Sequence, residues 1–220
     1  MRTKKYLFSA VASLAAAMFV SRVSGDEKQP TNPKPTEAKQ TEEPKKAEAG
    51  KQEPSAAAEM WAEWEKMNQP GEHHEHLKPL VGSWKCTLRI WAPNQPPSEH
   101  SGTIERKAVL GGRYVQEEFN GTMEGKPFSG IGFMGYDTLK QKHVASWMDS
   151  MSTGITTMIG SCDPSGKVFT MESTEVNPMT QAKDKSVLRI INNDKHVFEM
   201  FAPGPDGKEY KSFEMECTRK

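Results

Sequence analysis

The sequence lacks an excess of positive charge and is poor in aromatic residues. Its 220 residues include 29 lysines and arginines against 29 aspartates and glutamates, and aromatic residues make up only 8%. Four of the bases lie within the first 25 residues, which leaves 25 bases against 29 acids in the remainder. A nucleic-acid-binding protein that relies on bulk positive charge is therefore excluded.

Long apolar runs, cysteines and enzyme motifs are also scarce. After residue 25, no stretch approaches the roughly 20 apolar residues of a membrane helix, so we expect no stable membrane insertion of that part. The three cysteines allow at most one disulfide. The sequence contains no G-x-S-x-G, H-E-x-x-H or phosphate-loop motif. These absences favour a non-catalytic protein.

The first 25 residues have the three parts of a secretory signal peptide. Basic residues come first, an apolar stretch runs from Tyr6 to Val20, and Val23-Ser24-Gly25 supplies small residues for cleavage. The apolar stretch is short and contains two serines, which favours a cleaved signal peptide over an uncleaved anchor helix. We therefore predict export to the periplasm or the medium, where disulfides form.

Two segments separate the predicted signal peptide from the rest of the chain. Residues 26–58 contain five prolines, seven acids and six lysines but no aromatic or branched aliphatic residue, which predicts a disordered linker. Residues 59–70 predict a short amphipathic helix with its tryptophans and methionines on one side. We expect this apolar stripe to pack on the following domain. A membrane-surface role is less favoured, because the opposite side is acidic rather than basic.

Residues 71–220 predict a domain of β-strands. In its first segment, Trp84, Cys86, Leu88 and Ile90 alternate with polar residues and share one face. Further strands are expected near residues 101–110, 113–120, 127–136, 142–149, 154–162, 167–175, 185–191, 196–202 and 209–218. Turn residues separate these segments, and no helix is long enough for a crossover. The pattern predicts an all-β fold: a single closed antiparallel meander barrel of about ten strands.

A closed meander brings its first and last strands together, and each of these strands carries a cysteine on its apolar face. Cys86 and Cys217 would therefore approach each other. Two interpretations remain open: a disulfide, or two buried free thiols. We favour the free thiols, because cross-strand cysteine pairs often miss disulfide geometry.

Five segments of this domain also form a recognisable series. They are Leu77–Trp84 (LKPLVGSW), Leu110–Phe119 (LGGRYVQEEF), Gly130–Asp137 (GIGFMGYD), Trp147–Gly154 (WMDSMSTG) and His196–Met200 (HVFEM). In this order and spacing, they closely resemble the bacterial domain-of-unknown-function family 1579 over about residues 71–220. The resemblance implies a lipocalin-like barrel. It implies no activity, because the family is uncharacterised.

The segment from Trp147 to Gly154 is the best candidate for a functional site. Asp149 shares the face of Trp147, and it needs a partner such as Arg113 or His196 if it is buried. We favour a structural role in which its carboxylate caps the hairpin turn. In the alternative, Asp149, Arg113 and Glu117 orient a polar ligand at the barrel mouth. The candidate ligand-binding residues are Trp84, Arg113, Glu117, Trp147, Asp149 and His196.

Histidines suggest two cofactors, although we expect the protein to have none. One branch of lipocalin-like barrels uses an axial histidine to bind haem, and His196 lies in an apolar strand. A lone histidine among apolar residues is more often a hydrogen-bonded core residue. His73, His74 and His76 are candidates for Zn or Cu, but their spacing matches no closed structural zinc site.

The sequence as a whole predicts an exported, tethered barrel that binds a small, largely apolar ligand without catalysis. One alternative is a hydrolase or isomerase that uses Asp149 or Glu117 as a base. The other is an interaction module presented on the linker. A cavity would support binding or catalysis, whereas a barrel filled by side chains would favour the module. The sequence does not specify an oligomeric state.

Overall fold

The computed structural model describes residues 55–92, 95–178, 180–204 and 207–220. The predicted signal peptide and residues 26–54 of the predicted linker lie outside the described residues. The helical elements are α1 (Ala56–Met67), α2 (Glu72–Glu75) and the short 3-10 helices η1 (Lys78–Leu80) and η2 (Leu110–Gly112). The remainder is mainly strand.

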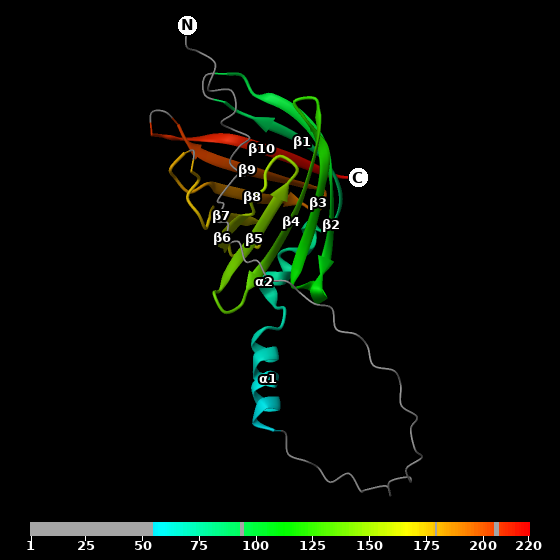
Figure 1. Cartoon of the computed structure of the whole chain (residues 1–220). Coiled ribbons are helices and arrows are strands. Elements are labelled where there is room, and N and C mark those ends of the chain that lie inside the picture. The colour runs from blue at the N-terminus through cyan, green and yellow to red at the C-terminus, as the bar shows by residue number, and fades with distance from the viewer. Residues whose placement is uncertain (1–54, 93–94, 179, 205–206) are drawn as a thin grey trace, which may run out of the picture.

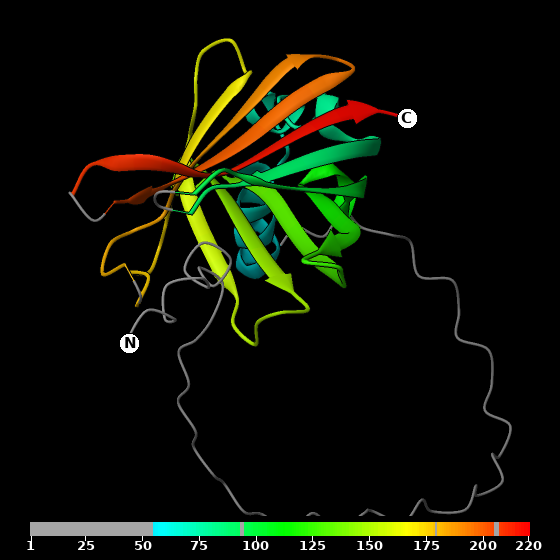
Figure 2. The same cartoon turned by 90° about the horizontal axis from the view of Figure 1, so that it is seen from above.

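Ten antiparallel strands close into one barrel in which each strand pairs with its neighbours in sequence (Figures 1 and 2). They are β1 (Gly82–Ile90), β2 (Ser98–Val109), β3 (Tyr114–Met123), β4 (Lys126–Asp137), β5 (Lys142–Asp149), β6 (Thr156–Cys162), β7 (Val168–Ser173), β8 (Lys185–Asn192), β9 (Lys195–Pro203) and β10 (Glu209–Arg219). β1 pairs with β10 to complete the circle. The predicted all-β closed meander is confirmed.

Alternating burial along the strands explains why these segments form a barrel. In β1, Trp84, Cys86, Leu88 and Ile90 are buried, whereas the residues between them are more exposed. Because successive strand residues point to opposite faces, this alternation places the apolar set inside. Closure also removes both sheet edges, which would otherwise present unpaired backbone groups to solvent.

A short plug, defined here as residues 72–80 with α2 and η1, closes one end of the barrel. Leu77 and Leu80 of this segment are almost fully buried. The indole Nε1 of Trp84 donates a hydrogen bond to the Leu80 carbonyl at 2.9 Å. The guanidinium of Arg219 lies 4.2 Å from the centre of the Trp84 ring and donates to the carbonyls of Val81 and Pro79. We call this the plugged end and the opposite one the far end.

A disulfide joins Cys86 of β1 to Cys217 of β10. The two residues face each other directly in the strand register, with their Cα atoms 4.1 Å apart. The interpretation favoured from the sequence, two free thiols, is therefore wrong. The strand register explains the disulfide, because it places Cys86 directly opposite Cys217 with both sulfur atoms on the inner side of the two adjacent strands. The third cysteine, Cys162, is free.

Helix α1 differs from its prediction in two ways. It begins at Ala56, three residues before the expected start, where Ser55 accepts a hydrogen bond from the Ala58 backbone N–H. Its apolar stripe does not pack on the barrel: Trp61 is 64% exposed, and none of the residues in α1 is buried. Figure 1 shows the helix standing away from the plugged end. Within the described chain, no helix is long and apolar enough to cross a membrane.

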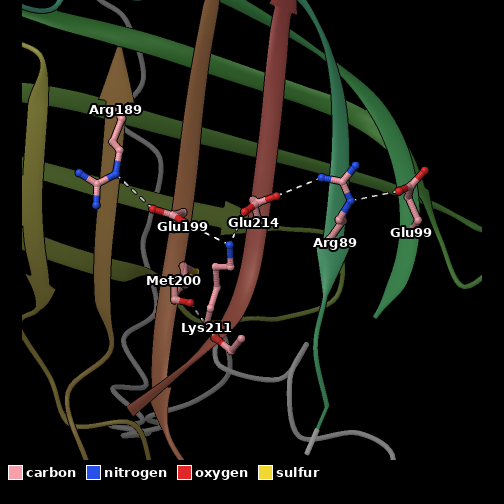
Figure 3. A network of polar contacts seen from close by, with 8 residues as sticks. Arg89, Glu99, Arg189, Glu199, Met200, Lys211 and Glu214 are labelled. Carbon is pink, nitrogen blue, oxygen red and sulfur yellow. Dashed lines mark hydrogen bonds and ion pairs between the residues drawn. The ribbon is translucent and has the colours of Figure 1, made fainter. Parts of the chain in front are cut away.

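A row of alternating charges crosses the outer face of five strands (Figure 3). It contains Arg189 on β8, Glu199 on β9, Lys211 and Glu214 on β10, Arg89 on β1 and Glu99 on β2. Arg89 on β1 pairs with both neighbouring strands: its Nη1 lies 3.0 Å from Glu214 Oε1 on β10, and its Nε lies 3.1 Å from Glu99 Oε2 on β2. Single surface ion pairs contribute little, but this network links the strands on both sides of the closure.

Removal of the disulfide is expected to destabilise the barrel without unfolding it. The bond spans 131 residues, so the Cys86→Ala/Cys217→Ala variant should lose about 2–4 kcal/mol of unfolding free energy, because its unfolded chain is less constrained. Urea denaturation of the two proteins measures the difference. Cys162→Ser is the control and should leave the unfolding free energy nearly unchanged. Alkylation of Cys86 and Cys217 in the unreduced, unfolded protein would contradict the assignment of the disulfide.

Candidate functional site

The barrel encloses a cavity of about 230 Å³ that is lined mainly by apolar side chains. Its volume lies just below the range of about 300–1,000 Å³ typical of ligand pockets, which restricts an occupant to a small molecule. Six methionines contribute to the lining: Met123, Met134, Met158, Met171, Met200 and Met215. Because methionine is flexible and polarisable, this wall can adapt to different apolar shapes.

Trp147 and Asp149 line the cavity toward the far end, where β5 finishes. The Trp147 ring lies over two glycines of β4, and a Cβ atom added at Gly130 would come within 2.2 Å of it. Glycine at this position therefore makes room for the tryptophan. The strand register places Gly130 opposite Asp149 and Gly132 opposite Trp147.

Asp149 caps the turn that follows β5. Its Oδ1 accepts hydrogen bonds from the backbone N–H groups of Met151 at 2.8 Å and Ser152 at 3.1 Å, and its Oδ2 accepts one from the Trp147 indole at 3.0 Å. The structural role favoured from the sequence is confirmed. The expected partners, Arg113 and His196, are wrong, because the turn itself and the neighbouring indole satisfy the carboxylate.

Arg106 and Glu117 form an ion pair in the half of the cavity nearest the plug. They lie directly opposite each other on β2 and β3. Arg106 donates from Nε to Glu117 Oε2 at 2.6 Å, and its Nη2 lies 2.5 Å from the same oxygen. Arg106 Nη1 donates to His196 Nε2 at 2.7 Å. A charged pair therefore interrupts an otherwise apolar wall.

His196 is fully buried behind this pair and does not line the cavity. Burial, with the nearby charges of Arg106 and Arg219, lowers the pKa of His196 to about 3, so its ring is neutral and accepts from Arg106. Its other face packs edge-on against Trp84, with the ring centres 4.3 Å apart. Arg106 occupies Nε2, and the whole ring is buried outside the cavity lining, so the residues do not fit the haem hypothesis.

The six predicted ligand-binding residues do not form a single site. Glu117, Trp147 and Asp149 line the cavity, whereas Trp84 and His196 are buried behind it. Arg113 lies outside it, beside η2 at the plugged end, and donates to the Leu110 carbonyl at 3.4 Å. The expected mouth group of Asp149, Arg113 and Glu117 therefore does not assemble, because Arg113 lies outside the cavity, and Trp84 does not reach the cavity to contact a ligand.

Sequence reasoning missed Arg106. The alternation along β2 could have identified it. Arg106 shares the inner face of β2 with Ile104, so this pattern places a charged residue among apolar ones. Only the β2–β3 register shows that Glu117 is the residue opposite.

The histidines at the plugged end pack against one another and against β4 and β5. His73 stacks on Tyr136 with ring centres 4.2 Å apart, and His74 Nδ1 accepts from the Gly71 N–H at 3.1 Å. His143, which the sequence analysis did not single out, is 1% exposed and donates from Nε2 to the His73 carbonyl at 3.4 Å. Among the described residues, no group of three or more His, Cys, Asp or Glu side chains is arranged to hold a metal ion.

Comparisons with known proteins identify the fold and the family. A family model described as "Protein of unknown function (DUF1579)" matches residues 69–219. Among curated proteins, no match is found. The solved structure of Rv2717c from M. tuberculosis is similar at 15% identity and a TM-score of 0.51, covering 69% of this chain and 99% of that one. The S-type phycobiliprotein lyase CPES from Guillardia theta matches at 12% identity and a TM-score of 0.46, covering 71% and 97%. The first of these structures supports the lipocalin-like barrel and nothing more specific.

Replacement of Asp149 by Asn tests its role in the turn. The carboxylate accepts hydrogen bonds through both oxygens, whereas the amide has only one acceptor oxygen. The variant therefore loses either the bonds from the turn or the bond from the Trp147 indole. We expect a loss of about 1 kcal/mol in unfolding free energy, measured by urea denaturation. The Thr153→Ala variant, at an exposed position of the same connection, is the control and should leave the unfolding free energy nearly unchanged. Unchanged stability of Asp149→Asn would contradict the capping role.

Acid is expected to weaken the plugged end through His143. Burial lowers the pKa of His143 to about 4, from an ordinary value of 6.5 in the unfolded chain. The unfolded state therefore binds more protons, so the stabilisation is complete above about pH 6.5 and is lost as the pH falls toward 4. The loss should be on the order of 2 to 3 kcal/mol.

The His143→Phe variant should reduce the slope of this part of the stability profile, because it removes one titrating ring and keeps its shape. His196 and His74, whose pKa values burial also lowers, should account for the slope that remains. Urea denaturation between pH 7 and pH 4 provides the measurement. Tyr136→Phe changes the adjacent ring but retains every histidine, so it should keep the parent's slope. If His143→Phe also keeps that slope, His143 is not the source of the acid sensitivity.

Proposed function

We propose that this chain, which belongs to the family described as "Protein of unknown function (DUF1579)", binds a small, largely apolar molecule inside its barrel without transforming it. The observation that carries the proposal is the cavity of about 230 Å³, walled by apolar and methionine side chains. Burial of apolar ligand surface in such a site is favourable by roughly 25 cal/mol per Å². A few polar groups in an apolar wall are typical of ligand pockets.

The bonding of the titratable groups around the cavity supports binding rather than catalysis. Asp149 is held by three hydrogen bonds in its turn, and Glu117 is paired with Arg106. His196 lies behind Arg106 and does not line the cavity. A general base needs a free acceptor within reach of the proton that it removes. An enzyme using Glu117 remains the second candidate, because one of its carboxylate oxygens is not used by Arg106.

The proposal includes export of the barrel to the periplasm or the medium. The basic, apolar and small-residue segments of residues 1–25 support it. The Cys86–Cys217 disulfide adds support, because such bonds persist mainly in oxidising compartments. Residues 26–54 would then act as a tether between the cleavage site and the folded part, which begins with helix α1.

Native mass spectrometry of the protein from its own host's exported fraction tests both parts of the proposal. We expect a chain that begins at Asp26, together with a small molecule released on unfolding. The full-length chain in the cytoplasmic fraction would contradict export. An exported chain that carries no small molecule and takes up no neutral apolar dye would contradict ligand binding.

A cavity-filling variant tests the position of the site. Ala145 lines the cavity, whereas Val144 precedes it on the opposite face of β5. Ala145→Phe should weaken binding of the neutral dye Nile red at least tenfold, measured by fluorescence titration, because the added ring occupies the cavity. Val144→Phe adds the same ring outside and should bind like the parent. Equal binding by both variants would place the dye elsewhere.

A further inference from the structure

The polar groups that line the cavity differ in how much hydrogen-bonding capacity remains. Asp149 uses both carboxylate oxygens within its turn. Asp184, near the far end, accepts from the Asn177 side chain at 3.2 and 3.3 Å. These two carboxylates are tied to loop residues. The Arg106–Glu117 pair is the charged group that remains for a ligand among the described residues of the lining.

This pair presents both a hydrogen-bond acceptor and hydrogen-bond donors. Arg106 contacts Glu117 only through Oε2, and Oε1 has no hydrogen-bond partner among the described residues. A guanidinium carries five N–H donors. Three of them point to Glu117 and His196, which leaves two. A ligand group beside the pair would therefore meet an acceptor and donors together.

The net charge of the pair is zero, which determines the ligand head group that it favours. An ionised carboxylate would be attracted by Arg106 but repelled by Glu117, and it would lose its hydration on entering an apolar cavity. An ammonium group would be attracted by Glu117 and repelled by Arg106, and it would also lose its hydration on entering the cavity. An uncharged group loses far less hydration free energy, and it leaves no buried charge without a counter-charge.

His196 acts as a positioning residue for the pair. It is fully buried, and its Nε2 accepts from Arg106 Nη1 at 2.7 Å on the side away from Glu117. Arg106 is itself almost completely buried, with 6% of its side chain exposed. Contacts on both sides hold the guanidinium in one orientation, so little ordering free energy is spent when a ligand binds.

We propose that the ligand ends in an uncharged group that both donates and accepts hydrogen bonds, such as a hydroxyl or primary amide, and that this end lies against Arg106 and Glu117. The hydroxyl would donate to Glu117 Oε1 and accept from Arg106, while the apolar remainder would extend along the methionine-lined wall toward Trp147. This inference rests on the proposed function and specifies the class of ligand.

Displacement of Nile red by four compounds with the same carbon chain tests the inference: decanol, decanamide, decanoate and decylammonium. We expect decanol and decanamide to displace the dye at concentrations at least tenfold lower than the two ions. Binding of the dye with decanoate or decylammonium as the best competitor would overturn the head-group assignment and leave the proposed function intact. Failure of the dye and all four compounds to bind would overturn both.

Removal of the negative charge should shift the preference toward the anion. In Glu117→Gln, the charge of Arg106 has no counter-charge, so the affinity for decanoate relative to decanol should rise at least tenfold. Glu118→Gln is the matched control, because Glu118 is the next residue of β3, points outward and pairs with Lys107. An unchanged ratio in Glu117→Gln would overturn the assignment of the pair.

A second variant covers the case in which Glu117→Gln does not fold. Arg106→Met/Glu117→Leu replaces both charges with apolar side chains of similar size, a change that buried ion pairs often tolerate. This variant should bind Nile red like the parent, while its affinity for decanol falls about tenfold. Parent-like affinity for decanol would show that the pair does not contact the head group, and would overturn the inference.

Discussion

The pairing of β1 with β10 is the constraint on which the rest of the structure depends. It converts an open sheet into a barrel and places Cys86 opposite Cys217, where the disulfide joins the first and last strands. On the outer face, Arg89 bridges the same closure to Glu214. Arg219, the last residue of β10, also reaches across the plugged end to Trp84. Covalent, ionic and packing contacts thus reinforce one boundary, without which the cavity would have no continuous wall.

The cavity lowers the stability of the folded barrel, and contacts elsewhere in the structure must offset this loss. Protein interiors are normally close-packed, and unfilled space destabilises a core. Here one group of buried apolar residues surrounds Trp84 and the disulfide, and a second lies beneath the plug around Leu77 and Phe169. These clusters, with the disulfide, supply the rigidity that lets a space persist between them.

Much of the fold was predictable because its signals are local. Alternating burial and turn residues predicted the ten strands, and the position of Asp149 before a polar turn predicted its capping role. The candidate site was less predictable. Arg113 occupies a strand connection at the plugged end, and His196 faces Arg106 from 90 residues away. Neither the position of Arg113 nor the contact between His196 and Arg106 can be read from a single strand. Each depends on which strands are neighbours and on the register in which they pair.

The sequence by itself determined the all-β class, the meander order and the apolar interior, because a period of two and the turn chemistry act within a few residues. Only the tertiary structure decided which inward residues meet. It joined Cys86 to Cys217, set Glu117 opposite Arg106 and left Trp61 of α1 exposed. The reason is geometric: a shift of one residue in register would turn every side chain of a strand to the other face. The chemistry of the cavity therefore follows from register and closure, which arise when the whole barrel forms.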